Sequence, residues 1–210
     1  GFRACYANAA DVGDGSCNGE QSCQQEVDDA VYFEVDSGSC NGKRSCGANI
    51  GNISDSSCLG DEACNGNEGN IGVGSCDGLF ACLGNDADIA DRSCISDEKT
   101  IEDVTDGDPF DYIGVCQFND GAISSDSCQG LESCSSNTAS ISSESCIGDI
   151  ACISNSAVVG QRCCIGSGSC LANTGDIDGP DSCLGIEACC RNNVLVGANE
   201  CTEDESCSRC

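Results

Sequence analysis

The chain repeats itself every 18 residues, and nearly every repeat carries two cysteines with five residues between them. Segments 55–74, 125–144 and 143–162 align without a gap, and like residues recur at the same places in all of them. The period is too short for a pair of helices, and frequent Gly and Ser disfavour helices altogether. The repeat therefore predicts turns of chain that stack directly on one another, with like residues in columns.

Position 1 of a repeat is its first cysteine and position 7 its second, and four other positions also keep their residue type. Position 14 is Val or Ile, position 3 mostly Gly, position 18 mostly Ser and position 10 mostly Asn. We expect the Cys and aliphatic residues to point inward, and the Ser column to face outward, where it could carry O-linked sugar. Stacked Asn side chains can donate and accept, so they should form a polar ladder. The ladder residues are Asn8, Asn49, Asn67, Asn85, Asn119, Asn137, Asn155, Asn173 and Asn192.

These columns predict an all-β fold, namely a single-stranded β-solenoid (a parallel β-helix) of about ten 18-residue turns, stapled by disulfides. Short strands with Gly at the corners fit the pattern. Residues 1–210 would form a single solenoid domain, with insertions at 24–39 and 95–115 that interrupt the period.

A second phase of the repeat stays open, and so does the handedness. Hexapeptides such as LGDEAC and IGDIAC resemble those of left-handed parallel β-helices, and that phase would turn the cysteines outward. It would bury positions 2 and 8, which mix Leu and Ile with Asn, Asp and Gln. This mixture disfavours the second phase.

Cysteine makes up 24 of the 210 residues, and His is absent. Such a content is typical of disulfide scaffolds in oxidising compartments, and C-x5-C spacing without His disfavours zinc. Bonds within each repeat would replace the hydrophobic core that so narrow a fold lacks. Bonds between adjacent repeats are the alternative, since stacked Cα atoms also lie within bridging distance. The preferred pairing gives these bonds: Cys17–Cys23, Cys40–Cys46, Cys58–Cys64, Cys76–Cys82, Cys94–Cys116, Cys128–Cys134, Cys146–Cys152, Cys164–Cys170, Cys183–Cys189 and Cys201–Cys207.

Four cysteines are left over, namely Cys5, Cys163, Cys190 and Cys210. Cys5 and Cys210 lie in incomplete repeats near the two ends of the sequence, so we expect that they can bridge adjacent subunits. The partners of Cys163 and Cys190 stay open.

The formal charge is −28, from 36 acidic and 8 basic residues. Such a charge disfavours nucleic acid and anionic membranes, and it favours hydration and the uptake of divalent cations. No run of 18 apolar residues is present, so we expect no membrane insertion. The start of the sequence reads as a mature N terminus without its secretion signal, and we expect a secreted protein, extracellular or at the cell surface.

The second insertion and one sequon are candidate sites. Asp103, Asp106, Asp108 and Asp111 cluster in the insertion, and clustered carboxylates suit calcium, the only cofactor that the sequence suggests. Their spacing does not match an EF-hand loop, so a solvated acidic loop is the alternative. Asn52 begins the sequon NIS, and a sugar there would make the chain a glycoprotein.

The motif S-C-x-G-x-x-[AS]-C, with I-G-x-x-S-C between copies, resembles the cysteine-rich repeats of secreted proteins common in microalgae, and it covers most of the chain. The stapling also resembles that of the disulfide-rich β-helical antifreeze proteins of insects. Those proteins have a shorter turn and an outward Thr-x-Thr array, whereas this chain has five Thr and no such array. The first resemblance implies a secreted repeat protein.

We expect a structural protein rather than an enzyme, because His is absent and no Ser or Cys has an identifiable base. The first hypothesis is a subunit that stacks end to end on copies of itself into an extracellular filament, with glycans or divalent cations joining filaments. The alternative is a monomeric binding module that presents a repetitive face to ice, mineral or polysaccharide.

Overall fold

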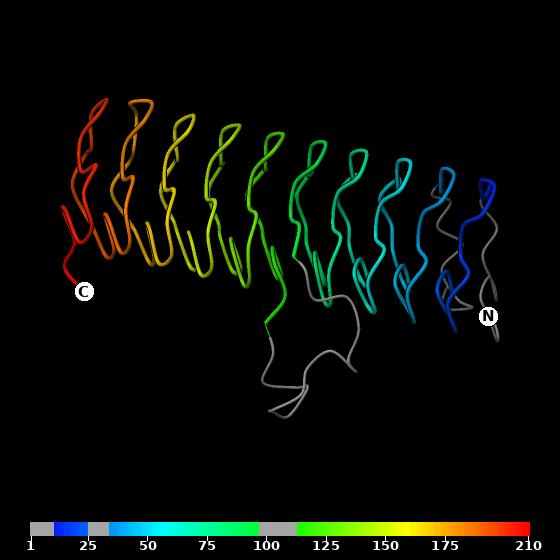
Figure 1. Ribbon diagram of the computed structural model, residues 1–210. Helices are drawn as coiled ribbons and strands as arrows, with labels where there is room; N and C mark the ends of the chain where they lie inside the picture. The colour runs from blue at the N-terminus through cyan, green and yellow to red at the C-terminus, as the bar shows by residue number, and fades with distance from the viewer. Residues whose placement is uncertain (1–10, 25–33, 97–112) are drawn as a thin grey trace.

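The chain forms one continuous row of stacked coils, and each coil is one repeat (Figure 1). The computed structural model describes residues 11–24, 34–96 and 113–210. We use the word column for the set of like positions in successive coils. Residues 34–39, which follow one gap, are already in register with the columns, since their backbone groups bond to neighbouring coils, and Val115, after the next gap, accepts from Cys82 N (2.9 Å) of the preceding coil.

Column 14 keeps the coils in register. Its residues pair as parallel β-bridges in one unbroken line, in which Ile53 bridges Ile71 and Ile71 bridges Ile89. The line runs from Val12 to Val196, and from its second member onward its side chains are at most 2 % exposed. The stacking that the 18-residue period predicts is therefore confirmed.

The predicted all-β solenoid, in contrast, is wrong. The described residues contain no helix and no continuous strand, and they form no sheet. Parallel pairing is limited to isolated bridges, which lie in column 14 and, from Asp77 to Leu184, in column 2. The molecule is a disulfide-rich repeat fold of stacked coils.

The backbone conformation explains why strands do not form. Non-glycine residues with positive φ recur in columns 1, 5, 7, 9 and 17, and Cys128 (φ 55°), Glu132 (φ 56°) and Cys134 (φ 57°) are examples from one coil. A left-handed residue cannot belong to an extended strand. The corners expected from Gly are thus made mostly by other residues, and β-pairing is left to columns 2 and 14 alone.

Backbone groups find their partners in neighbouring coils. Left-handed residues of columns 5, 9 and 17 donate to the preceding coil, as Ser136 N does to Gln117 O (2.8 Å). Those of column 1 donate to the following coil, as Cys128 N does to Ser145 O (3.0 Å). Because buried N–H and C=O groups need such partners, each coil is held by the coils on either side.

Column 3 shows how closely the coils approach one another. A Cβ atom on Gly42 would lie 1.9 Å from the carbonyl oxygen of Gly60 in the next coil, so no larger residue fits there. This contact accounts for the Gly that recurs at position 3.

The cysteine columns lie inside the stack. From Cys17 to Cys189 the residues at positions 1 and 7 are buried, whereas column 2 reaches the surface, where Ile165 is 36 % exposed. The hexapeptide phase would turn the cysteines outward and bury column 2, so it is wrong.

Candidate functional site

Ten disulfides join position 1 to position 7 within coils and form a column inside the stack. Their Cα–Cα distances are 5.6 to 5.8 Å, which is usual for a disulfide. The structure thus has the pairing within repeats and not the alternative between repeats. The bonds are Cys17–Cys23, Cys40–Cys46, Cys58–Cys64, Cys76–Cys82, Cys94–Cys116, Cys128–Cys134, Cys146–Cys152, Cys164–Cys170, Cys183–Cys189 and Cys201–Cys207.

Sulfur atoms of neighbouring bonds lie close together along this disulfide column. In four groups, three sulfur atoms from two adjacent coils lie within 4.8 Å of one another, as those of Cys134, Cys146 and Cys152 do. Such groups would suit a soft metal ion only as thiolates, and here the sulfurs are oxidised. These cysteines could bind a metal only after reduction.

Cys190 and Cys210 form a further disulfide, with Cα atoms 5.8 Å apart. The backbone N of Arg209 donates to the carbonyl of Cys190 (2.9 Å), which sets position 10 of one coil beside position 8 of the coil before it. The expectation that Cys210 bridges adjacent subunits is therefore wrong, because its sulfur is already bonded within the chain. Cys5, the other candidate for such a bridge, lies outside the described residues.

The Asn side chains of column 10 form an uninterrupted ladder inside the stack. From Asn67 onward each Nδ2 donates to the Asn Oδ1 of the preceding coil and to a carbonyl two residues ahead; for Asn137 these bonds reach Asn119 (2.8 Å) and Ala139 (2.6 Å). The side chains are at most 1 % exposed, so the ladder is buried as well as continuous. It comprises Asn49, Asn67, Asn85, Asn119, Asn137, Asn155, Asn173 and Asn192. Asn8 lies outside the described residues.

The Ser side chains of column 18 form a second internal ladder, and the expectation that they face outward is wrong. The described members from Ser39 to Ser182 are fully buried. Ser57 Oγ donates to Gly72 O (2.8 Å) and accepts from Ser75 N (3.2 Å). Each hydroxyl thus satisfies two backbone groups of the next coil and is not free to carry sugar.

Cys163 occupies a Ser position of this second ladder and carries a free, buried thiol. Its N donates to Ser145 Oγ (3.1 Å), and its Sγ lies 2.9 Å from Gly179 O. Burial raises the pKa of the Cys163 thiol. The residue therefore stands in for Ser as a weak donor and is not activated as a nucleophile.

Column 17 carries ion pairs between neighbouring coils on the outer surface. Arg92 Nε lies 2.7 Å from Asp126 Oδ1, and Arg162 Nε lies 2.7 Å from Asp181 Oδ1. In both pairs a second guanidinium nitrogen donates to the other carboxylate oxygen. These hydrogen bonds hold the pKa of both carboxyl groups below the usual value. The pairs are exposed, so their contribution to stability is small.

The structure describes the predicted sequon but not the predicted calcium site. Asn52 is exposed in column 13, and its Oδ1 accepts a hydrogen bond from Glu34 N (3.0 Å) in the preceding coil. The expected calcium ligands lie outside the described residues: Asp103, Asp106, Asp108 and Asp111.

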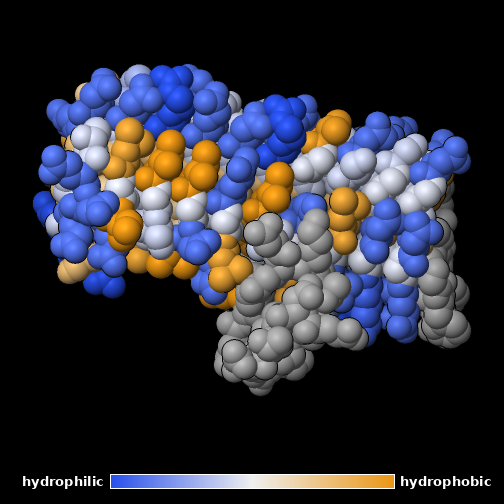
Figure 2. Space-filling view, viewed as in Figure 1, coloured by the Kyte–Doolittle hydropathy of each residue, from blue (hydrophilic) through white to orange (hydrophobic). Residues whose placement is uncertain are grey.

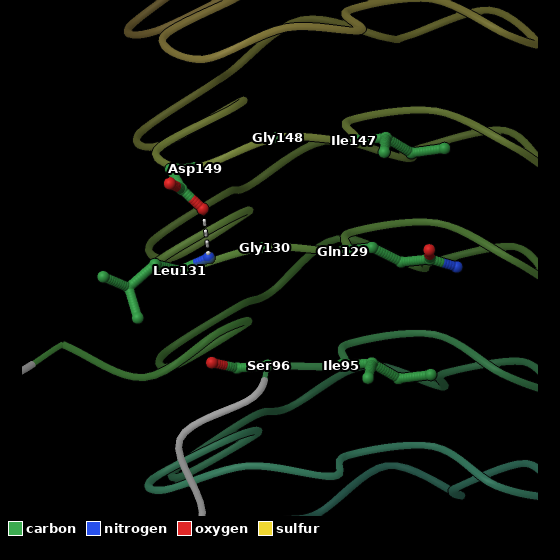
Figure 3. A pocket seen from close by; sticks show the side chains of 8 residues that line it. All are labelled: Ile95, Ser96, Gln129, Gly130, Leu131, Ile147, Gly148 and Asp149. Carbon is green, nitrogen blue, oxygen red and sulfur yellow. Dashed lines mark hydrogen bonds between the residues drawn. The ribbon is translucent and has the colours of Figure 1, made fainter. Parts of the chain in front are cut away.

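A shallow cavity of about 450 Å³ opens on the outer face (Figure 3). Ile95, Gln129 and Ile147 of column 2 lie in one row on three successive coils and line it, with the glycines of column 3 beside them. Asp149, at the edge of the cavity, accepts a hydrogen bond from Leu131 N (3.0 Å). The cavity is therefore mainly apolar, with one carboxylate that is already engaged.

Column 2 continues past the cavity as an apolar row through Ile165 and Leu184. Figure 2 shows one face of the stack, on which apolar side chains gather in rows nearer the C terminus. In earlier coils the same column is mixed, with Asn41 and Asp77 as well as Leu59. Sequence reasoning missed this row, although the aliphatic residues at Ile95, Ile147, Ile165 and Leu184 were the signal for it.

A second shallow groove, of about 500 Å³, follows columns 13 to 16 along the stack. Small residues of column 15, such as Ser54, Gly72 and Ala90, line its middle, and Asn70 and Asp88 of column 13 line one side. The groove offers hydroxyl, amide and carboxylate groups along the axis. Its lining residues include no His and no Cys, and thus no activated nucleophile.

Comparison with known families assigns the chain to one family. One family model matches residues 1–78, 28–108 and 99–206, which together cover nearly all of the sequence. The chain belongs to the family described as domain of unknown function DUF7640. Because the DUF7640 model matches three overlapping ranges, its unit spans several coils, as a repeat protein requires. Searches of curated proteins and of solved structures found no match.

Two features bear on where this DUF7640 member is found. Extensive disulfide bonding is typical of extracellular proteins. Among the described residues, no helix has the length and apolar character that a membrane crossing needs.

Proposed function

We propose that the chain is a secreted, extracellular structural protein, a stiff rod whose outer columns meet other molecules. The observation that carries this proposal is the continuity of the internal columns along the described stack. Column 14 and the Asn ladder pass from coil to coil without a break, the Ser ladder does so with Cys163 in place of one Ser, and a disulfide recurs within each coil. An interior of this kind leaves the outward positions free to vary without loss of stability.

The distribution of reactive groups also supports a structural role. Among the described residues every cysteine except Cys163 is in a disulfide, the Cys163 thiol is buried, and the arginine ion pairs on the surface are exposed. The proposal therefore assigns no catalytic step to this chain.

We further propose that rods stack end to end, and Glu200 is the residue that tests it. In preceding coils the N–H of column 15 donates to the next coil, as Asp178 N does to Val196 O (3.2 Å). Gly197 N instead donates to the Glu200 carboxylate (2.9 Å), which stands at a position 18 where other coils have Ser or Cys163. The Glu200 carboxylate thus occupies Gly197 N, the donor that would otherwise pair with a further coil.

Glu200→Ser should therefore increase end-to-end assembly, because it frees Gly197 N and restores the Ser of the column. Negative-stain electron microscopy under oxidising conditions would show longer rods for the variant than for the natural chain. Glu68→Ser removes the same charge from an exposed position of an inner coil, outside column 18, and should change nothing. If all three proteins give only dispersed single rods, end-to-end stacking is wrong.

A monomeric binding module is the second candidate, and the apolar row of column 2 favours it. Apolar side chains at regular spacing on a rigid support suit a flat, repetitive ligand such as an insoluble polysaccharide or a mineral face. Co-sedimentation with such matrices would test it. Ile165→Asp should abolish binding, whereas Val158→Asp, at an exposed apolar position in column 13, should not. Equal binding by both variants would rule out this face.

A further inference from the structure

The disulfide column brings the sulfur atoms of successive coils together, although each bond in it is closed within one coil. At four junctions the position-7 sulfur of one coil lies within 4.8 Å of the position-1 sulfur of the next. Sulfur atoms so placed are near enough to react once one of the bonds opens and the side chains reorient. The junctions are Cys116 with Cys128, Cys134 with Cys146, Cys152 with Cys164, and Cys189 with Cys201.

Solvent reaches this column at one described coil. Cys207 is exposed and Cys201 is partly exposed, whereas the position-1 and position-7 cysteines from Cys17 to Cys189 are buried. Exchange between a thiol and a disulfide requires access to the sulfur that is attacked. A thiol from solvent will therefore enter the column at the Cys201–Cys207 bond.

We propose that the column performs intramolecular thiol–disulfide exchange, which a small external thiol starts at Cys201–Cys207 and which moves bonds from within coils to between coils. The external thiolate attacks Cys207 Sγ, a mixed disulfide forms there, and the electron pair of the broken bond leaves on Cys201. The Cys201 thiolate then attacks Cys189 Sγ. The Cys189–Cys201 bond forms, the Cys183–Cys189 bond breaks, and Cys183 leaves as thiolate.

Each step conserves the number of disulfides, so the exchange needs no oxidant and consumes no reductant beyond the thiol that enters the mixed disulfide. The other three junctions have the same geometry, and a position-1 thiolate formed there would react in the same way. The product differs from the starting pairing in one mechanical respect. A bond within a coil closes a short loop, whereas a bond between coils ties the stack together along its axis.

The variant Cys207→Ser tests the exchange without an added thiol, because it leaves Cys201 free beside Cys189. The protein is held at mildly alkaline pH, quenched with acid, unfolded, alkylated and mapped by mass spectrometry. We expect a Cys189–Cys201 bond and alkylated Cys183, in amounts comparable to the starting pairing, because one disulfide of the column replaces another.

Cys190→Ser is the matched control, because it leaves Cys210 free in the same coil but outside the sulfur groups. Its alkylation should stay on Cys210. The natural chain treated with limiting monothiol provides a second measurement that does not depend on a variant. A Cys189–Cys201 bond in either experiment supports the proposal; its absence from both, or equal scrambling in the control, overturns it.

Discussion

Buried Asn and Ser side chains do in this molecule what strand ladders do in a sheet. The Asn ladder was predictable from the sequence, because an amide that recurs in register can both donate to and accept from its own kind. The Ser column was not, since a hydroxyl suits water as well as a carbonyl group. Ser57 can be buried because its hydroxyl donates to Gly72 O, and the sequence does not reveal where that carbonyl group lies.

Asn137→Asp should be among the most destabilising single changes in the chain. The new carboxylate would face Asn119 Oδ1 and Ala139 O, two acceptors that now receive hydrogen bonds, and it would be buried. We expect a loss of about 3 kcal/mol or more in the free energy of unfolding, measured with denaturant. Asn193→Asp, an exposed neighbour of the ladder, should stay within about 0.5 kcal/mol. A loss below about 1 kcal/mol for Asn137→Asp would contradict the role given to the ladder.

Cys163→Ser should remove an alkaline loss of stability. Burial raises the pKa of the Cys163 thiol above its unfolded value. Below about pH 8.5 both states keep the proton; above it the unfolded chain loses its proton first, so stability falls as the pH rises toward the folded pKa. The Ser variant should match the natural chain at neutral pH and lack this decline. Unfolding curves between neutral and alkaline pH would show it, and an identical decline in both proteins would refute it.

At the scale of one coil, the sequence predicts the disulfide but not the backbone conformation. C-x5-C spacing in register was enough to place the disulfides. The left-handed residues at columns 1, 5, 7, 9 and 17 were not predictable, because residues as different as Cys128, Glu132 and Ile150 adopt that conformation. Stacking contacts impose it against local preference. For that reason a sequence that stacks as expected still forms no strands.

The length of the loop that each disulfide closes should decide how much the bond adds to the free energy of unfolding. The Cys94–Cys116 bond closes a loop with a sequence separation of 22, against 6 for Cys146–Cys152. Replacing both cysteines by Ser should cost roughly 3 kcal/mol in the first case and roughly 2 kcal/mol in the second, by chain entropy. Both double variants lose one bond from the same column, so packing losses largely cancel. Equal losses in denaturant unfolding would show that strain or packing outweighs the loop term.

At the scale of the whole molecule, charge opposes the stack. The formal charge is −28, and ion pairs such as Arg92 with Asp126 can relieve little of it, because 36 acidic residues stand against 8 basic ones. Charge of one sign spread over a compact rod destabilises it by self-repulsion. The outward faces were the part of the candidate site that composition alone could not place. Net charge does not say which columns carry the charge and which, like column 2 from Ile95 onward, are mostly apolar.

Added salt should therefore stabilise the protein. Raising the ionic strength from about 0.01 M to about 1 M shortens the screening length roughly tenfold. Each kcal/mol of added unfolding free energy would raise the melting temperature by about 2–4 °C in a chain of this size. The control is the same titration near pH 4.1, the isoelectric point, where the net charge vanishes and salt should have little effect. A melting temperature at neutral pH that does not respond to salt would refute the argument.

Column-by-column bonding makes the length of this molecule adjustable. Removal of residues 128–145 would take out 18 residues and join Ser127 to Cys146, with every column kept in phase. Even the outer ion pairs would survive, because Asp126 would then lie next to Arg162 in column 17. Gene segments that encode one coil can thus be lost or duplicated without any change elsewhere, and a lineage can tune the reach of its rod in steps of a single unit.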